Sequence, residues 1–156
     1  TITMWLMGSL ANVSYRDVLL CAAIEIPCLA VAMILRWKMN LLSLEQEEAR
    51  SLGINVKKLR LAVILIATIM TAVTVSVCGI IGWIGLVIPH IARLLIGNDH
   101  RTLIPASALM GSIYLLLIDT AARAATAGEV PLSILTAMVG APFFAVILRK
   151  TSGGRE

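Results

Sequence analysis

Long stretches without charged side chains are the feature that most constrains how this chain can fold. Residues 61–92, 102–118 and 130–148 contain no Asp, Glu, Lys or Arg, and residues 18–35 contain only Glu25. A helix that crosses a bilayer needs about 20 apolar residues. Charged residues make up 14% of the chain, whereas soluble domains usually carry about 25%. The pattern therefore predicts an all-α membrane protein, because only a helix or a closed barrel pairs its backbone polar groups internally in lipid.

The run lengths predict about five transmembrane helices within a single domain of residues 1–156. Three of the runs fit one crossing each. The run 61–92 is too long for one helix and short for two, and the cluster Gly79, Gly82 and Gly85 divides it. The expected spans are residues 15–36, 61–79, 83–96, 103–124 and 131–149.

The positive charges predict the direction of the crossings. If the short helix 83–96 crosses, eleven of the 13 basic residues fall on one side, and Arg16 and Arg123 fall on the other. If it does not cross, the division becomes seven against six. Because basic residues concentrate on the cytoplasmic side, we expect the crossing, with the N-terminus outside and the C-terminus inside. The net charge of +4 then reflects topology, and we expect no nucleic-acid partner.

The opening segment is too short to span a membrane. Residues 4–10 are apolar, and Trp5 favours a short helix at the outer interface, where aromatic rings lie at headgroup level. The chain starts at Thr1 and shows no signal peptide, since no basic region precedes a cleavage site. We therefore expect a fragment of a longer protein or a split subunit.

The cysteine and histidine side chains predict no metal site. Cys21, Cys28 and Cys78 all lie inside apolar runs and lack C-x-x-C spacing, so we expect them to pack against other helices. His90 and His100 have no second ligand at a metal-binding spacing. We expect them to make local hydrogen bonds.

The longest polar insert, residues 36–60, predicts an ordered elbow on the cytoplasmic side. Ser43 can cap a helix start with Gln46 as its capping-box partner, and the acidic residues that follow favour a helix N-terminus. Gly53 is typical of a helix end, and Asn55 can begin the next helix. A solvated connector is the alternative, and the pattern alone favours neither.

Several motifs stand in order along the chain. They are Glu45–Gly53, Gly85–Leu94, Asp99–Arg101 with Pro105, Asp119–Arg123, Glu129–Leu132 and Gly140–Phe144. Together, over nearly the whole chain, they resemble the FecCD-type membrane permeases of ATP-binding-cassette (ABC) importers for iron-siderophore, haem and cobalamin. The resemblance covers only the second half of such a subunit. It implies that the first half, with much of the translocation path, is missing.

The resemblance implies a transport subunit and not an enzyme. Such permeases lie in the bacterial plasma (inner) membrane as homodimers or as heterodimers of like subunits. Two cytoplasmic ABC ATPases power them, and a substrate-binding protein outside delivers the chelate. This chain would bind no cofactor, because the partner ATPase uses the ATP.

The resemblance also assigns the elbow to a groove of the ATPase, within a coupling loop of residues 37–60. Apolar side chains would contact the ATPase, charged ones would pair at the rim, and Gly53 would set the bend. The coupling residues are Leu44, Glu45, Glu47, Glu48, Ala49, Arg50, Leu52 and Gly53.

Three further charged residues are candidates for a role, and the first two have two interpretations each. Arg123 would be a docking point for acidic side chains of the binding protein, or it only pairs with Asp119 one helical turn earlier. Glu25 is an acid inside a span and so a candidate for the translocation path, or it is a structural polar residue beside Pro27. Glu129 would shape the last hairpin.

The leading hypothesis is a permease subunit that couples ATP hydrolysis by a separate ATPase to uptake of an iron-siderophore or a related chelate. The chain has no G-x-x-x-x-G-K-[ST] phosphate-binding loop and would need none. An ion-coupled secondary transporter that uses Glu25 or Asp119 is one alternative. An inactive membrane fragment of a permease is the other. The motifs do not distinguish siderophore, haem and cobalamin.

Overall fold

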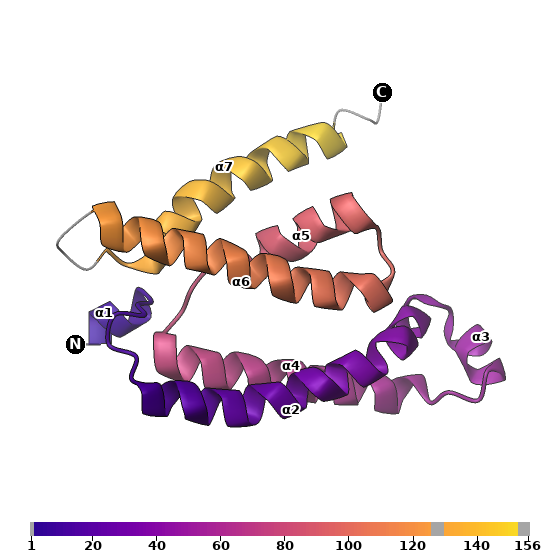
Figure 1. Ribbon diagram of the computed structural model, residues 1–156. Helices are drawn as coiled ribbons and strands as arrows, with labels where there is room; N and C mark the ends of the chain where they lie inside the picture. Colours follow the sequence, from indigo (N-terminus) through magenta and orange to yellow (C-terminus); the bar gives the residue numbers. More distant parts are fainter. Residues whose placement is uncertain (1, 126–129, 153–156) are drawn as a thin grey trace.

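The computed structural model describes residues 2–125 and 130–152, and within these ranges it contains helices and no strand (Figure 1). The helical elements are α1 (Ile2–Leu6), α2 (Tyr15–Met39), the 3-10 helix η1 (Asn40–Ser43), α3 (Gln46–Ser51), α4 (Val56–Cys78), α5 (Ile84–Ile96), α6 (His100–Ala125) and α7 (Leu132–Ser152). The all-α prediction is therefore confirmed.

Four of the described helices are long and apolar enough to cross a membrane. Helices α2, α4, α6 and α7 have 25, 23, 26 and 21 residues. At about 1.5 Å per residue each exceeds the roughly 30 Å of a hydrocarbon core. Their bounds contain the predicted spans apart from single terminal residues, because each helix continues into a polar or basic turn beyond its apolar run.

The short helix predicted at residues 83–96 is present as α5 (Ile84–Ile96). Helix α5 has 13 residues, so it extends about 20 Å and is too short to cross the roughly 30 Å core alone. Residues 79–83 before it are not helical. The glycine cluster therefore marks the break between α4 and α5, as the sequence predicts.

Hydrogen bonds at the two ends of the bundle show that this broken segment still carries the chain from one end to the other. At one end, Ser9 N–H donates to Cys78 O at 3.0 Å, and Leu132 N–H donates to Gly8 O at 3.0 Å. At the opposite end, Asn40 Nδ2 donates to an Asp99 carboxylate oxygen at 2.7 Å. We call these the α1 end and the elbow end. Residues 79–98 connect them, so the chain makes five passes with four long helices.

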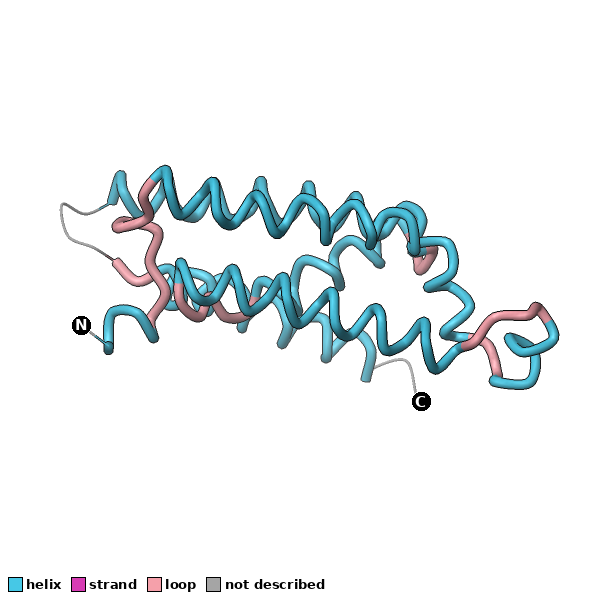
Figure 2. Tube along the Cα trace, turned by 90° about the horizontal axis from the view of Figure 1, so that it is seen from below, coloured by secondary structure: helices cyan, strands magenta, loops and turns pink. Residues whose placement is uncertain are grey.

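The arrangement separates the basic residues as the charge pattern predicts. Arg16 and Arg123 lie at the α1 end, whereas the other described basic residues lie on α3 and on the termini of α2, α4, α5, α6 and α7 at the elbow end (Figure 1). Figure 2 shows the elbow projecting beyond that end of the long helices. The placement of the elbow end in the cytoplasm stays a prediction.

The N-terminal residues pack closely on the start of the irregular segment 79–83. Gly79 has φ +73°, and a Cβ built on it would lie 1.9 Å from the backbone oxygen of Trp5. A Cβ on Gly8 would lie 2.6 Å from the backbone oxygen of Ile80. Irregular backbone at membrane depth is tolerated where protein covers it, and α1 with the turn after it supplies that cover at the start of the segment.

The helices pack in two groups that share α6. Helix α5 packs on α6 and α7, whereas α2 packs on α4 and α6. The Trp83 ring meets Phe144 edge-on at 6.4 Å between centroids, and Gly140 admits Trp83, since a Cβ there would lie 2.8 Å from the Trp83 Cβ. By contrast, α2 is described throughout and has no buried residue.

Candidate functional site

The elbow begins differently from the sequence prediction. The Ser43 hydroxyl donates to Asn40 O at 2.6 Å inside η1, and the residue that precedes α3 is Glu45, which makes no side-chain cap. The predicted capping box from Ser43 is therefore wrong. Leu44 is extended, with ψ 156°, and it separates η1 from α3, so that Ser43 cannot reach the first turn of α3.

The end of α3 and the start of α4 follow the prediction. Gly53 has φ +73°, and its N–H donates to Arg50 O at 2.9 Å. Ile54 N–H donates to Ala49 O at 3.4 Å, which completes the two bonds of a Schellman C-terminal motif. The Asn55 side chain then accepts from Lys58 N–H at 3.1 Å and caps α4. The elbow is thus an ordered helix-turn.

The exposure of the elbow decides which of its residues can contact a partner. Leu44 and Leu52 are exposed by 40% and 60%, whereas Ala49 is fully buried. Ala49 is therefore removed from the expected contact surface, since a side chain without accessible area cannot touch another protein. The described acidic side chains of α3 and Arg50 are exposed. An open hollow of about 360 Å³ lies beside them, lined by Arg50, Gly53, Ile54, Asn55, Val56 and Lys57.

A cluster that the sequence did not reveal joins the start of the elbow to the α5–α6 turn. Asn40 Nδ2 donates to Asp99 Oδ1 at 2.7 Å, and Asn40 Oδ1 accepts from His100 N–H at 2.9 Å. The His100 Nδ1 lies 2.7 Å from the same Asn40 oxygen. The hydrogen bond from Asn40, with one from Arg101 N–H, holds the pKa of Asp99 below its usual range. We call Asn40, Asp99 and His100 the clasp.

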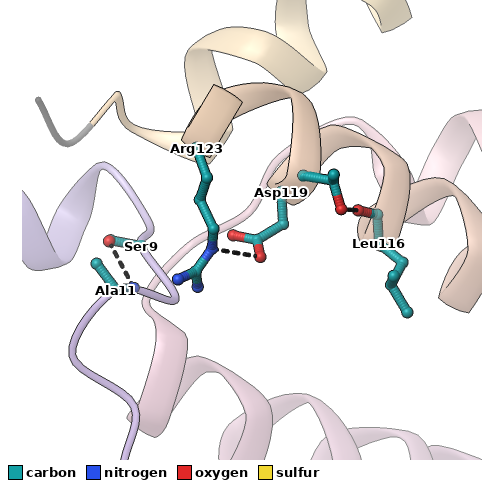
Figure 3. Close-up of polar contacts among 6 residues, drawn as sticks. Ser9, Ala11, Leu116, Asp119 and Arg123 are labelled. Atoms are coloured by element: carbon teal, nitrogen blue, oxygen red, sulfur yellow. Dashed lines mark hydrogen bonds and ion pairs between the residues drawn. The ribbon is translucent and has the colours of Figure 1, made fainter. Parts of the chain in front are cut away.

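At the α1 end, Arg123 and Asp119 form an ion pair (Figure 3). Arg123 Nε donates to Asp119 Oδ2 at 2.8 Å, and the Arg123 side chain is 61% exposed whereas that of Asp119 is 25% exposed. Glu129 lies outside the described residues.

Glu25 lines a cavity between helices. Its Oε1 lies 2.9 Å from Thr74 Oγ1, and the cavity of about 570 Å³ has walls from α2, α4, α5 and α6 that include Ser107 and Ser112. No group of three His, Cys, Asp or Glu that could hold a metal occurs in residues 2–125 and 130–152. Glu25 is thus placed beside hydroxyl groups rather than in a metal-binding cluster.

Comparison with known proteins finds a match along nearly all of the chain. The sequence profile of the FecCD transport family matches residues 1–150. The chain is 41% identical over 154 residues to the molybdate import system permease protein of Haemophilus influenzae, which covers 99% of this chain and 46% of that protein. It is 44% identical over 153 residues to a probable iron chelatin transport system permease protein of Helicobacter pylori, covering 97% and 47%.

A solved structure of a metal-chelate type ABC transporter in an inward-facing conformation matches with a TM-score of 0.92 and 42% identity. The match covers 96% of this chain and 50% of that one. The chain therefore spans about half the length of the curated relatives and of the solved structure that it matches.

Proposed function

The chain belongs to the FecCD transport family, and from this premise we propose that it is part of the membrane permease of an ABC importer. The observation that carries the proposal is the 0.92 TM-score, at 42% identity, to a metal-chelate type ABC transporter. The capped elbow between two long apolar helices supports it, because a lever between ATPase and membrane needs ordered structure.

We propose that the substrate is an iron chelate or a related compound. Relatives at 40–44% identity are named for molybdate, iron chelatin and hemin. Molybdate is an oxyanion and not a chelate, so substrates differ in chemistry within the family at this level of identity. The metal would reach the permease already bound by its chelator.

The proposed mechanism involves no bond chemistry in this chain. A separate ATPase closes on ATP, the elbow moves with it, and the spanning helices rock between outward and inward states, as alternating access requires. A catalytic site or bound cofactor is not needed for this role. The partners would be a cytoplasmic ATPase, a substrate-binding protein outside and a second permease subunit in a bacterial inner membrane.

Reconstitution tests the proposed function. The assembled importer, with its ATPase and binding protein in proteoliposomes, should take up radiolabelled ferric chelate only with ATP, and loaded binding protein should stimulate ATP hydrolysis. Uptake driven by a proton or sodium gradient without the ATPase would support a secondary transporter instead. Uptake under neither condition, from assembled complexes, would leave the inactive-fragment hypothesis.

Replacement of Arg123 should weaken docking of the binding protein. We expect Arg123→Ala to raise the Kd about two- to fivefold at low salt, since exposed ion pairs contribute up to about 1 kcal/mol and rim charges steer association. The difference should disappear at high salt, as screening predicts. Binding of the binding protein to permease in nanodiscs measures both values.

Two further variants separate docking from the local ion pair. Asp119→Asn removes the pair but keeps the Arg123 charge, so it should leave the Kd near the unmodified value. Arg16→Ala removes the other basic side chain of the α1 end and controls for overall charge. Equal effects of Arg123→Ala and Asp119→Asn would assign Arg123 to the pair alone.

A further inference from the structure

The clasp is a contact between two parts of the chain that lie far apart in sequence. Asn40 is the first residue of η1 and leads from α2 into the elbow. Asp99 and His100 form the turn between α5 and α6, and 59 and 60 positions separate them from Asn40. The clasp therefore connects the elbow directly to helices that the elbow does not precede or follow.

The amide of Asn40 is matched to its three partners. Its NH₂ group donates to the Asp99 carboxylate at 2.7 Å, and its oxygen accepts the His100 backbone N–H at 2.9 Å. The His100 ring can donate to that oxygen only from a protonated Nδ1, since an amide oxygen has no proton to give. A second link lies beside the clasp, because Arg36 Nη1 donates to Arg101 O at 3.2 Å.

Helix α2 packs along α4 and α6, and η1 continues from its elbow end. No residue of α2, which is described in full, is buried, whereas α5 buries Val87, Ile88 and Ala92. The clasp lies at the polar elbow end, where the Asn40 amide joins η1 to the α5–α6 turn by hydrogen bonds of defined geometry. The clasp therefore adds a specific polar connection between η1 and the α5–α6 turn to the packing of the helices.

From this geometry we propose that the clasp is a coupling strut, with Asn40 as its positioning residue. When the ATPase moves the elbow, the clasp makes the α5–α6 turn move with it as one body. This inference rests on the proposed function as an ABC permease. Helix α5 then carries the movement toward the irregular segment 79–83 and, through Trp83 and Phe144, toward α7. Without the clasp, the ATPase would still hydrolyse ATP and move the elbow, but α5 and α6 would not move with it.

The first test removes the clasp in the assembled importer. Asn40→Ala should lower the amount of ferric chelate transported per ATP hydrolysed by at least about fivefold. This is the smallest change that coupling between two sites of a protein typically produces, in a range of about 5- to 150-fold. Thr102→Ala is the matched control, because the Thr102 hydroxyl bonds only Asp99 O within the same turn, at 3.1 Å. An unchanged ratio for Asn40→Ala in complexes that assemble normally would overturn the proposal.

The second test restores the clasp with its polarity reversed. Asn40→Asp places two carboxylates together and should lose coupling as Asn40→Ala does. Adding Asp99→Asn supplies an amide donor to the new carboxylate, which can still accept from His100, so the double variant should recover most of the transport per ATP. A variant that merely misfolds would lower the yield of assembled complexes and not this ratio.

The outcomes separate the strut from the proposed function. If the double variant couples no better than Asn40→Asp, the strut is excluded while uptake by the unmodified importer still supports the function. If the unmodified importer shows no ATP-dependent uptake, the proposed function fails first. Recovery in the double variant, with Thr102→Ala unchanged, supports the strut, because a purely local role of Asn40 would not depend on the residue at position 99.

Discussion

Gly79→Ala is expected to destabilise the protein by about 2–6 kcal/mol and to release the N-terminal residues from the end of α4. Gly79 has φ +73° and ψ −165°, a backbone conformation that is essentially restricted to glycine and costs another residue about 1–3 kcal/mol. The added Cβ would lie 1.9 Å from the Trp5 backbone oxygen, and overpacking adds about 1–3 kcal/mol. Thermal unfolding in detergent micelles measures the loss as a lower midpoint.

Gly82→Ala is the matched control for this effect. Gly82 lies in the same irregular segment, its φ is not positive, and a Cβ there would have no described atom within 4 Å. Because the clash at Gly79 is with a backbone oxygen, trimming the Trp5 side chain should not relieve it. Equal unfolding midpoints for Gly79→Ala and Gly82→Ala would show that the N-terminal segment does not pack on α4 as described.

Gly53→Val is expected to uncouple ATP hydrolysis from uptake by at least about tenfold. A tenfold change corresponds to about 1.4 kcal/mol, and a β-branched residue at φ +73° costs more than the 1–2 kcal/mol of an ordinary side chain. No described atom lies within 4 Å of a Cβ at Gly53, so the effect is conformational and not a clash. Chelate transported per ATP in the assembled importer is the measurement.

A series at position 53 separates the bend from other causes. Gly53→Pro should be at least as harmful as Gly53→Val, since it also removes the N–H that donates to Arg50 O. Gly53→Asn should retain the most coupling, because asparagine tolerates left-handed backbone. The expected order of coupling is therefore Asn, then Ala, then Val and Pro. Full coupling in Gly53→Val would remove the lever role from the elbow.

Much of the elbow was predictable because its signals are local. The left-handed turn at Gly53 and the cap from Asn55 each depend on residues within one helical turn, and the structure has both. The predicted capping role of Ser43 was wrong because another local hydrogen bond competes with it. The Ser43 hydroxyl donates to Asn40 O instead of capping α3. Burial of Ala49 was not predictable, since an alanine fits equally well on a contact surface or inside the turn.

The sequence predicted only part of the clasp at the α5–α6 turn. Asp99 and His100 stand in a motif that resembles the permease family, but Asn40 had no pattern to mark it. Glu25 was singled out as an acid within a span, yet its neighbour Thr74, 49 residues away, was not. Such pairs form only when two helices lie side by side, which no periodicity along one helix can report.

The sequence by itself determined that this protein is helical, where its four long spans lie and how its basic residues divide between two ends. Hydropathy and helix caps are properties of a single segment, so they can be read one segment at a time. Only the tertiary structure decided that Gly8 and Gly79 admit the N-terminal segment, and that Asn40 bridges to Asp99 and His100. In lipid, packed and lipid-facing surfaces are both apolar, so the sequence does not mark which faces of the helices meet.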